Sequence, residues 1–586
     1  MRSPGFPTSR LLTPLRHIVL AFLLLLVVWY YLVGSIDDLS YTTNNTPLPA
    51  NREHPIDTLI ARAEKEFDAL LATETKTLAD SAAAYRKRRG RHPPPGFGDW
   101  FKFAQDNEVI LVEDFWDQIY HDLEPFWALP ATQIRKDACD FEMTINVRDH
   151  KATAGSDWSW TQIWLDLTRT IEHLLPDMDI ALNAMDEPRI VVPWEDLAGY
   201  IREAQKTKHM PEVHDVVTEF QKLPAPGEDP QSDRKPTEKN WEDTSAFVAY
   251  RNLELVLGIS VAEKPVTPTG PFWNVVKRLN GIFIEPLTVS STEVLFPLFG
   301  GSKLAVNNEI LLPAPVYWNE EERYTGGADH GGPWAEKISE AVWRGVATGG
   351  KSRENTWRAF QRHRFVAMNN STKLSLAQNW TALPANFELP DNSIVAQLEG
   401  KLGEWVSSWS NMGFVDLFCE PPPRDPEPRT SCPYTTPHFD VLPGLKMQEQ
   451  FAKKYLPDID GNSFSGRYLG FLRSTSLPIK ATLWREWHDS RLVAWKHFVP
   501  MDNRYSDWFG IMQYFLGHEG ESENVPAHDE AAEGIASSGK EWAEKVLRKE
   551  DMQVYVLRLL LEYARVSDER REKMGWVDDL VSGMDD

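Results

Sequence analysis

Residues 454–480 read KYLPDIDGNSFSGRYLGFLRSTSLPIK and carry the pattern that decides the fold class. The segment begins with an apolar run, continues with a turn rich in Gly, Ser and Asn, and then becomes helical around Arg467. This order predicts a strand, a loop and a helix. Free backbone N–H groups at the start of such a helix, with Arg467 beside them, would bind an anion such as a nucleotide diphosphate. The alternative is an Asn or Ser helix cap with a surface arginine.

Short apolar runs that alternate with helical stretches precede this segment. They lie at residues 180–182, 190–192, 247–250, 342–343 and 365–367. Short buried strands between helices are typical of α/β proteins with parallel sheets. The pattern covers roughly 470 residues, which by the usual size of domains predicts two α/β lobes. Residues 540–566 are strongly helical and end the patterned region.

Composition and charge exclude several classes of protein. The chain has 586 residues and a formal net charge of −24, which argues against a nucleic-acid-binding protein. An aromatic content of 11% excludes a disordered chain. The chain has 3 cysteines, which exclude a disulfide-dense scaffold and a zinc site made of four cysteines. The histidines show no H-E-x-x-H or other metal-ligand spacing.

The N-terminus contains an uncharged run, IVLAFLLLLVVWYYLVG at residues 18–34, that is just long enough to cross a membrane. Three arginines precede the run and two aspartates follow it: Arg2, Arg10, Arg16, Asp37 and Asp38. Because positive charge stays on the cytoplasmic side, residues 1–17 are expected in the cytoplasm and the body in the lumen. We therefore predict a single-pass type II anchor in the membrane of the Golgi or endoplasmic reticulum; a cleaved signal peptide is the alternative.

Glycosylation triplets agree with a lumenal body. Their acceptor residues are Asn44, Asn369, Asn370 and Asn379. Cys419 and Cys432 flank a proline-rich loop and are candidates for a disulfide, which would leave Cys139 as a buried thiol.

A helix rich in Ala, Glu and Lys is predicted at residues 55–85. We expect it to be part of a lumenal stem, residues 35–95, that holds the body away from the membrane. The basic run RKRRGRH at 86–92 follows. We interpret it as a solvated turn; a processing site and an anion-binding patch are the alternatives.

Two motifs suggest nucleotide chemistry but are weakly supported by their context. Residues 345–352, GVATGGKS, match the P-loop pattern of an ATPase or kinase. The strand before them is very short, and the motif lies deep in the chain. The D-x-D triplets at 177–179 and 458–460 are of the kind that holds a divalent metal in some glycosyltransferases. Such triplets are frequent in an acidic chain.

Two aspartates are candidates for a general base. Asp186 lies in an acidic turn that follows the apolar run LPDMDIALNAMDEPR at 175–189, and Asp149 lies in a similar context. A carboxylate after a buried strand is well placed for chemistry. For Asp186 the alternative is a turn residue before Pro188. Spacing alone does not separate these interpretations.

Taken together, the motifs resemble glycosyltransferase family 90, the family of capsule-associated proteins and protein O-glucosyltransferases. Besides the opening segment, WRGVATGG at 343–350, WREWHDSRLVAWKHFVP at 484–500 and the stretch around Asp186 carry the likeness, which covers roughly residues 86–570 in order. The resemblance implies an α/β GT-B fold, with two Rossmann-like lobes and an inter-lobe cleft. It also implies an inverting transfer of glucose or xylose from UDP-glucose or UDP-xylose.

The resemblance assigns roles to particular residues. Asp186 becomes the catalytic base in preference to Asp149. The residues that then fall at the UDP-sugar site are Arg344, Gly345, Thr348, Ser463, Ser465, Gly466 and Arg467, with Glu486 and His497 shaping the nucleotide pocket. The chain departs from the family at Met185, where an Arg is usual, and at Ala347, where a basic residue is often found.

The resemblance also sets the expected partners and organisation. No cofactor and no divalent metal are expected beyond the UDP-sugar donor, and the acceptor is a hydroxyl of a polysaccharide, glycolipid or protein. We expect an N-terminal lobe at 96–310, a C-terminal lobe at 311–570 that ends in a helix, and a tail at 571–586. The alternatives are a metal-dependent transferase of a different fold, a lumenal P-loop kinase or ATPase, and a catalytically silent carbohydrate-binding relative.

Overall fold

The computed structural model describes residues 54–139, 141, 143–225, 242–243, 280–287, 290–390, 393–421 and 431–581. The predicted membrane anchor at 18–34 and the glycosylation candidate Asn44 lie outside these residues. Within the described part, no helix combines the length and apolar character needed to cross a membrane. Residues 59–586 form one compact unit.

The first of two five-stranded sheets is built from the N-terminal half of the body. Its order is β2 (Lys151–Ala154), β1 (Thr144–Arg148), β3 (Met178–Leu182), β6 (Leu298–Gly300) and β7 (Ile310–Leu311). Strand β1 runs antiparallel to β2 and β3, whereas β3, β6 and β7 are parallel. Every residue of β3 is buried, as expected for a strand covered on both faces.

The second sheet is parallel throughout and contains the segment quoted above. Its order is β12 (Val499–Pro500), β11 (Leu477–Ala481), β10 (Lys453–Ile459), β8 (Ile338–Val346) and β9 (Ser410–Asp416). Residues 454–480 form β10, a loop, α18 (Tyr468–Arg473) and β11, so the predicted strand, loop and helix are confirmed. The two sheets confirm a mixed α/β protein with parallel sheets.

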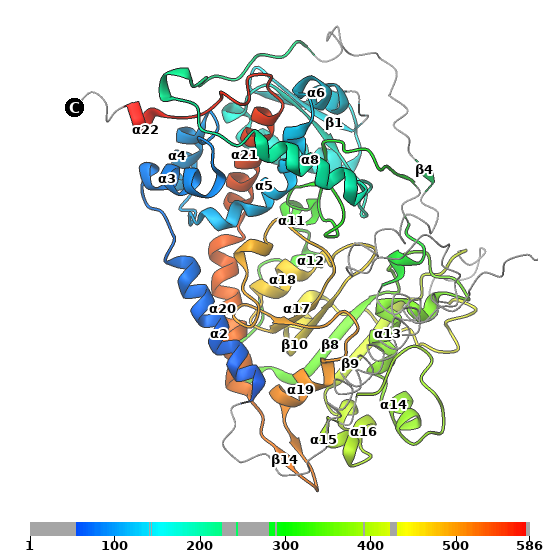
Figure 1. Cartoon of the computed structure of the whole chain (residues 1–586). Helices are drawn as coiled ribbons and strands as arrows, with labels where there is room; N and C mark the ends of the chain where they lie inside the picture. Colours follow the sequence, from blue (N-terminus) through cyan, green and yellow to red (C-terminus); the bar gives the residue numbers. More distant parts are fainter. Residues whose placement is uncertain are drawn as a thin grey trace, which may run out of the picture. The chain divides into compact units, whose positions relative to one another are not determined.

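Helices surround both sheets (Figure 1). Around the first sheet lie α4 (Phe97–Asp106), α5 (Asp117–Leu123), α6 (Ala131–Cys139), α7 (Ser159–Ile171), α8 (Trp194–Lys206) and α11 (Pro315–Asn319). The later part of the chain adds α12 (Glu322–Thr325), α13 (Gln361–Met368), α14 (Ser371–Gln378), α15 (Val395–Leu398), α16 (Leu402–Ser407), α17 (Met447–Phe451), α19 (Trp508–Leu516) and α22 (Asp578–Val581). Two short antiparallel strand pairs lie outside the five-stranded sheets: β4 (Glu242–Asp243) with β5 (Ser290–Ser291), and β13 (His518–Glu519) with β14 (Asn524–Val525).

Two consecutive C-terminal helices connect the second sheet to the first. Helix α20 (Asp529–Val546) contacts α18 and β11 of the second sheet, and α21 (Lys549–Val566) contacts α4, α5 and α7 near the first. Figure 1 shows them in succession, from orange to red. The Tyr563 hydroxyl donates to the backbone oxygen of Asp179 at 3.0 Å, and that of Tyr555 to Leu311 at 3.2 Å. The end of the chain thus returns to the first sheet.

The segment expected to form a stem packs on the body instead. It forms two helices, α2 (Pro55–Leu71) and α3 (Leu78–Arg89). The Phe67 ring lies 4.8 Å from that of Trp542, and the buried Tyr85 hydroxyl donates to Glu562 at 2.7 Å. Because apolar and aromatic side chains of both helices lie in the core, the prediction of a free stem is wrong for residues 59–89.

The basic run is likewise part of the packed structure and is not a solvated turn. Arg86 donates two hydrogen bonds of 2.7 Å to the carboxylate of Asp579. Arg89 pairs with Glu113 at 2.8 Å, and the side chain of Arg91 is buried. The sequence did not reveal these partners, because they lie elsewhere in the chain.

The candidate disulfide is not formed in the structure. Cys419 and Cys432 are both free thiols and both buried, and Cys139 is a free thiol as well. The two buried thiols are hydrogen-bonded to one another, and burial raises the pKa of Cys419 to about 12. The two candidate cysteines are therefore neighbours in the structure.

We expect Glu562 to hold the N-terminal helices onto the body. Its carboxylate accepts hydrogen bonds from Tyr85 and Tyr120 and pairs with Arg565, all within the core. Glu562→Ala would leave Arg565 buried without its carboxylate, which should cost about 3–5 kcal/mol of unfolding free energy in urea denaturation. The exposed Glu541→Ala is the control; an equal effect of the two changes would contradict this role.

Candidate active site

Asp186 lies at the carboxyl end of β3, on a turn that buried polar groups hold in place. The amide nitrogen of the Asn183 side chain donates to the backbone oxygen of Glu187 at 2.9 Å. One carboxylate oxygen of Glu309 accepts from the backbone N–H of Arg189 and, at 2.8 Å, from that of Ile190. The turn that presents Asp186 is therefore fixed on both sides.

The carboxyl ends of β8 and β10 provide two adjoining loops, 346–350 and 459–463. One guanidinium, from Arg362 of α13, joins them: it donates to Val346 at 3.0 Å, to Ile459 at 3.0 Å and to the Thr348 hydroxyl at 2.6 Å. Gln361 beside it donates to the backbone oxygen of Gly461 at 2.9 Å. These bonds join the two loops into one edge.

Asn462 links this edge to Asp186. Its side-chain oxygen accepts from the backbone N–H of Gly349 at 3.0 Å and of Gly350 at 3.2 Å, and its side chain is hydrogen-bonded to Asp186. Since the oxygen is occupied by the two glycines, the amide nitrogen faces the carboxylate. Gly349 has φ +132°, and a Cβ there would lie 2.4 Å from the Gln361 amide nitrogen, so only glycine fits. Asn462 thereby joins the carboxyl ends of strands from both sheets.

The environment of Asp186 suits a general base. Its side chain is exposed, although the surrounding protein atoms are dense enough that desolvation raises its pKa. The hydrogen bond from Asn462 acts in the opposite direction, because a donor stabilises the carboxylate. A carboxylate whose pKa is raised accepts a proton more readily than that of an ordinary aspartate.

The loop that precedes α18 contains a row of backbone donors without acceptors among the described residues. Among the described residues, no acceptor is found for the backbone N–H groups of residues 462–467. Ser463, Ser465 and Gly466, which the resemblance places at the UDP-sugar site, lie in this row. Helix α18 has only six residues, so the donors themselves, rather than a long helix dipole, make the row attractive to an anion.

Arg467 and Arg344 have different surroundings. One nitrogen of the half-buried Arg467 donates to the backbone oxygen of Arg344 at 2.5 Å, and the others have no acceptor among the described residues. The Arg344 side chain is held by β9 instead, with bonds of 2.6 and 2.8 Å to Asn411. Gly345 follows in β8, where a Cβ would lie 2.6 Å from the Trp343 ring. Arg467 is thus the freer of the two predicted arginines.

Glu486 belongs to a buried network beneath the loop. Its carboxylate accepts from the Tyr317 hydroxyl at 2.6 Å and from Lys480 at 3.1 Å. Burial alone would raise its pKa, but Lys480 and His488 lower it to about 2. Glu486 is therefore a permanently charged structural anchor.

His497 is not brought together with Asp186. Its Nδ1 accepts from the backbone N–H of Val493 at 2.9 Å, and its ring stacks on Trp542 with centroids 5.7 Å apart. Burial lowers its pKa to about 3, so the ring stays neutral. Its place between α2 and α20 supports packing, not nucleotide contact.

The P-loop interpretation is contradicted. The N–H groups of Gly349 and Gly350 are occupied by Asn462, and that of Lys351 donates to Glu285 at 2.8 Å. The next α-helix, α13, begins only at Gln361. Phosphate would find neither the free amides nor the helix that a P-loop requires.

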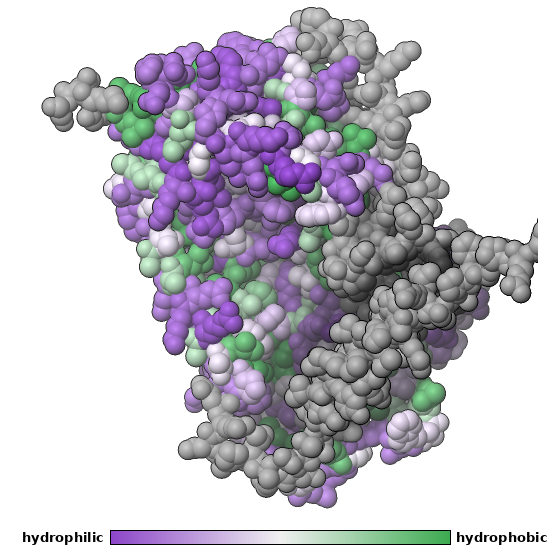
Figure 2. All heavy atoms as spheres, in the orientation of Figure 1, coloured by the Kyte–Doolittle hydropathy of each residue, from purple (hydrophilic) through white to green (hydrophobic). Residues whose placement is uncertain are grey.

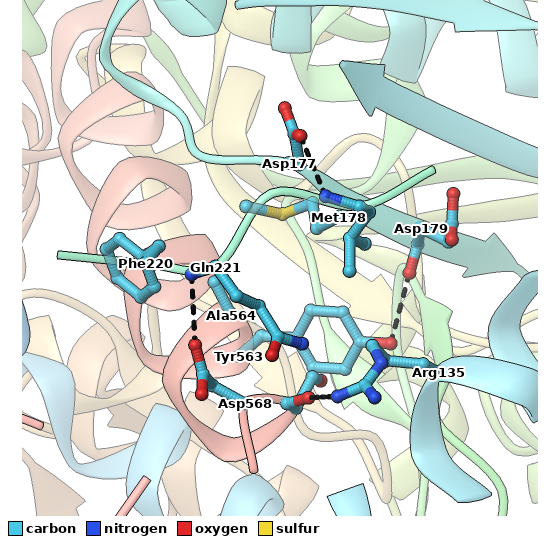
Figure 3. Close-up of a pocket in the computed structure, with 11 residues that line it drawn as sticks. Arg135, Asp177, Met178, Asp179, Phe220, Gln221, Tyr563, Ala564 and Asp568 are labelled. Atoms are coloured by element: carbon cyan, nitrogen blue, oxygen red, sulfur yellow. Dashed lines mark hydrogen bonds between the residues drawn. The ribbon is translucent and has the colours of Figure 1, made fainter. Parts of the chain in front are cut away.

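The D-x-D triplets also have structural roles. Asp179 is buried, and its carboxylate contacts Asn146 and Arg148 at 2.6 and 2.9 Å. Asp177 accepts from the N–H of Asp149 at 2.8 Å. Figure 3 shows the small cavity beside them, whose volume of about 20 Å³ has room for about one water molecule.

The second triplet, Asp458 and Asp460, is fully buried at the end of β10. Asp460 accepts from the N–H of Leu483 at 2.8 Å, and burial raises its pKa to about 7. Among the described residues, no group of three or more His, Cys, Asp or Glu is arranged to hold a metal ion. The rival base Asp149 is exposed and pairs with Lys222 at 2.8 Å.

The described glycosylation candidates differ in accessibility. Asn369 is buried, donates to the backbone oxygen of Phe365 at 2.8 Å and accepts from the Trp508 ring at 3.0 Å. It is therefore excluded as a glycan acceptor in the folded protein. Asn370 and Asn379 are exposed and remain candidates.

A comparison with family models agrees with the resemblance expected from the sequence. The model of glycosyl transferase family 90 matches residues 440–580. This segment contains Asn462, Arg467 and the helices α20 and α21, whereas Asp186 and β8 precede it. The match confirms the likeness to this family over that part of the chain and supports a glycosyltransferase role.

The residues that organise this site were only partly visible in the sequence. Asn462 lies in the quoted segment, but its link to Asp186 was not predicted. Arg362, Gln361 and Glu309 were missed, since none belongs to a motif. A buried glutamate shows no local signal, because its two donors, the N–H groups of residues 189 and 190, are distant in sequence.

Glu309 should make stability depend on pH. Burial raises its pKa to about 7, although the two backbone donors lower it. The folded state favours the neutral acid. The stabilisation that Glu309 gives is therefore complete below its pKa in the unfolded state, and it is lost as the pH rises through its pKa in the folded state. Glu309→Gln should therefore gain about 3 kcal/mol over the wild type between about pH 5 and about pH 8 in urea unfolding. Equal slopes for wild type, Glu309→Gln and the exposed control Glu212→Gln would contradict the assignment.

Proposed function

We propose that the protein is an inverting glycosyltransferase that moves glucose or xylose from a UDP-sugar to an acceptor hydroxyl. Asp186 removes the proton from that hydroxyl, and the oxygen attacks the anomeric carbon as the bond to the diphosphate breaks. The departing UDP takes the negative charge. The observation that carries the proposal is the hydrogen bond between Asp186 and Asn462, which sets a base beside a row of unused anion donors.

The same row supplies stabilisation of the leaving group. The N–H groups of residues 462–467 are fixed before the reaction, so they need no reorganisation as charge develops on the diphosphate. Arg467 adds a planar donor group suited to phosphate. Arg344 acts through its backbone oxygen, which orients Arg467. Thr348 acts through Arg362, which braces the loop.

The wider assignments follow from this chemistry. We propose a GT-B fold in which each five-stranded sheet is the centre of one lobe and the donor binds in the inter-lobe cleft, on the side of the C-terminal lobe. We further propose that the reaction needs no divalent metal and that the acceptor is a polysaccharide, glycolipid or protein. We also propose that residues 18–34 anchor the protein in the membrane of the Golgi or endoplasmic reticulum, with the catalytic body in the lumen.

Replacing Asp186 tests the role of the base. Asp186→Asn keeps the shape of the side chain but cannot accept the proton, so transfer should fall by a factor of about 10² to 10⁴. Release of UDP from UDP-glucose and from UDP-xylose, with acceptor and with or without EDTA, is the measurement, and calorimetric UDP binding should be unchanged. Asp149→Asn is the matched control.

Normal turnover of Asp186→Asn would overturn the assignment. Loss of UDP release in the presence of EDTA would replace the proposed mechanism with a metal-assisted one. UDP binding without transfer by the wild type, for every donor and acceptor tried, would favour a silent relative.

Two changes at Asn462 separate its two contacts. Asn462→Ala and Asn462→Asp both remove the donor to Asp186, so the acidic limb of the profile of kcat/KM against pH should move to higher pH, and further in Asn462→Asp, where like charges meet. Only Asn462→Asp retains acceptor oxygens for Gly349 and Gly350. An unmoved acidic limb in both variants would show that Asn462 does not tune the base.

A further inference from the structure

A second polar cavity lies among α3, α5, α8 and α21 and has no residue in common with the candidate active site. Its volume is about 280 Å³, large enough for a sugar-sized molecule. Five Lys and Arg side chains and three carboxylates line it: Arg88, Arg89, Arg91, Lys208, Arg565, Asp117, Glu124 and Glu562. Figure 2 shows hydrophilic residues covering the face over α5 and α8. The excess of positive charge is unusual in a chain with a net charge of −24.

Ion pairs account for all these cations except Arg91. Arg88 pairs with Asp114 at 2.9 Å, and Arg89 pairs with Glu113 at 2.8 Å. Lys208 pairs with Glu124 at 2.7 Å, and Arg565 pairs with Glu562. Among the described residues, no carboxylate lies within ion-pair distance of Arg91.

The Arg91 guanidinium is nonetheless buried and held in one orientation. The residue is 7% exposed, and its guanidinium carbon lies 3.5 Å from the centre of the Trp127 ring. Two of its nitrogens donate to Thr207, to the backbone oxygen at 2.5 Å and to the hydroxyl at 2.6 Å. Both acceptors are neutral. Burial, aided by the charge of Arg565, lowers the pKa of Arg91 to about 10.

A buried cation without a counter-ion is unfavourable, whereas a stacked guanidinium with free N–H groups is ready to bind an oxyanion. We infer that this cavity is a binding site for a small anion, in which Arg91 pairs with a carboxylate or phosphate group of a sugar-sized molecule. Among the basic residues that line the cavity, Arg88, His121 and Lys208 have the more exposed side chains, and Arg88 and Lys208 are paired with carboxylates. The site is independent of the proposed transfer reaction.

Isothermal titration calorimetry of the whole chain tests the site. The probes are glucuronate, for a carboxylate sugar, inorganic phosphate, for a phosphate source, and glucose as the neutral control. One of the two anions should bind and glucose should not. Arg91→Gln should weaken binding by about tenfold or more, because the charge-assisted bonds are lost. Lys87→Gln, an exposed change in the same basic run, should leave binding unchanged.

Binding of neither anion, or equal affinities of Arg91→Gln and the wild type, would overturn the inference. A second pair of variants keeps the test decisive if Arg91→Gln does not fold. His121→Glu puts a negative charge on the exposed lining of the cavity and should weaken anion binding, whereas His214→Glu, at an exposed histidine outside the cavity, should not. UDP release should be the same in His121→Glu and His214→Glu. Equal anion affinities in these two variants would also overturn the inference.

Discussion

The burial of α21 is the constraint on which the structure depends. Fifteen of its 18 residues are buried, including the charged residues Asp551, Arg558, Glu562 and Arg565. Buried charges are tolerated only with partners, and the partners come from distant parts of the chain. Tyr85, Tyr120 and Glu113 approach it from the N-terminal helices, while Tyr563 reaches the backbone of β3. Helix α21 thereby ties the first sheet to the N-terminal helices.

This arrangement has a consequence for the candidate active site. Because α20 packs on the second sheet and α21 near the first, the helical pair fixes the frame in which the two sheets present their carboxyl ends. Asn462 then makes a single hydrogen-bonded connection between the loops, with Gly349 and Gly350 on one side and Asp186 on the other. The Asp186 carboxylate and the backbone N–H groups of residues 462–467 become neighbours through packing that lies away from both.

The sequence was informative wherever chemistry and local pattern coincide. The strand, loop and helix at 454–480, the parallel α/β architecture and the family likeness all follow from short segments whose apolar spacing and turn residues act locally. The sequence failed where the deciding partner is distant. The basic run resembled a solvated turn until Asp579 and Glu113 were brought to it, and the Gly-rich loop resembled a P-loop until Asn462 occupied its amides.

The sequence alone therefore determined the fold class, the family likeness and the identity of Asp186 and Arg467 as candidates. Only the tertiary structure decided that residues 59–89 belong to the body, that His497 packs against Trp542, that Asn369 is buried, and that Cys419 and Cys432 remain thiols. The physical reason is the range of the interactions. Periodicity and turn chemistry act between near neighbours, whereas burial, ion pairing and the satisfaction of polar groups depend on which remote segments fill the space around a side chain.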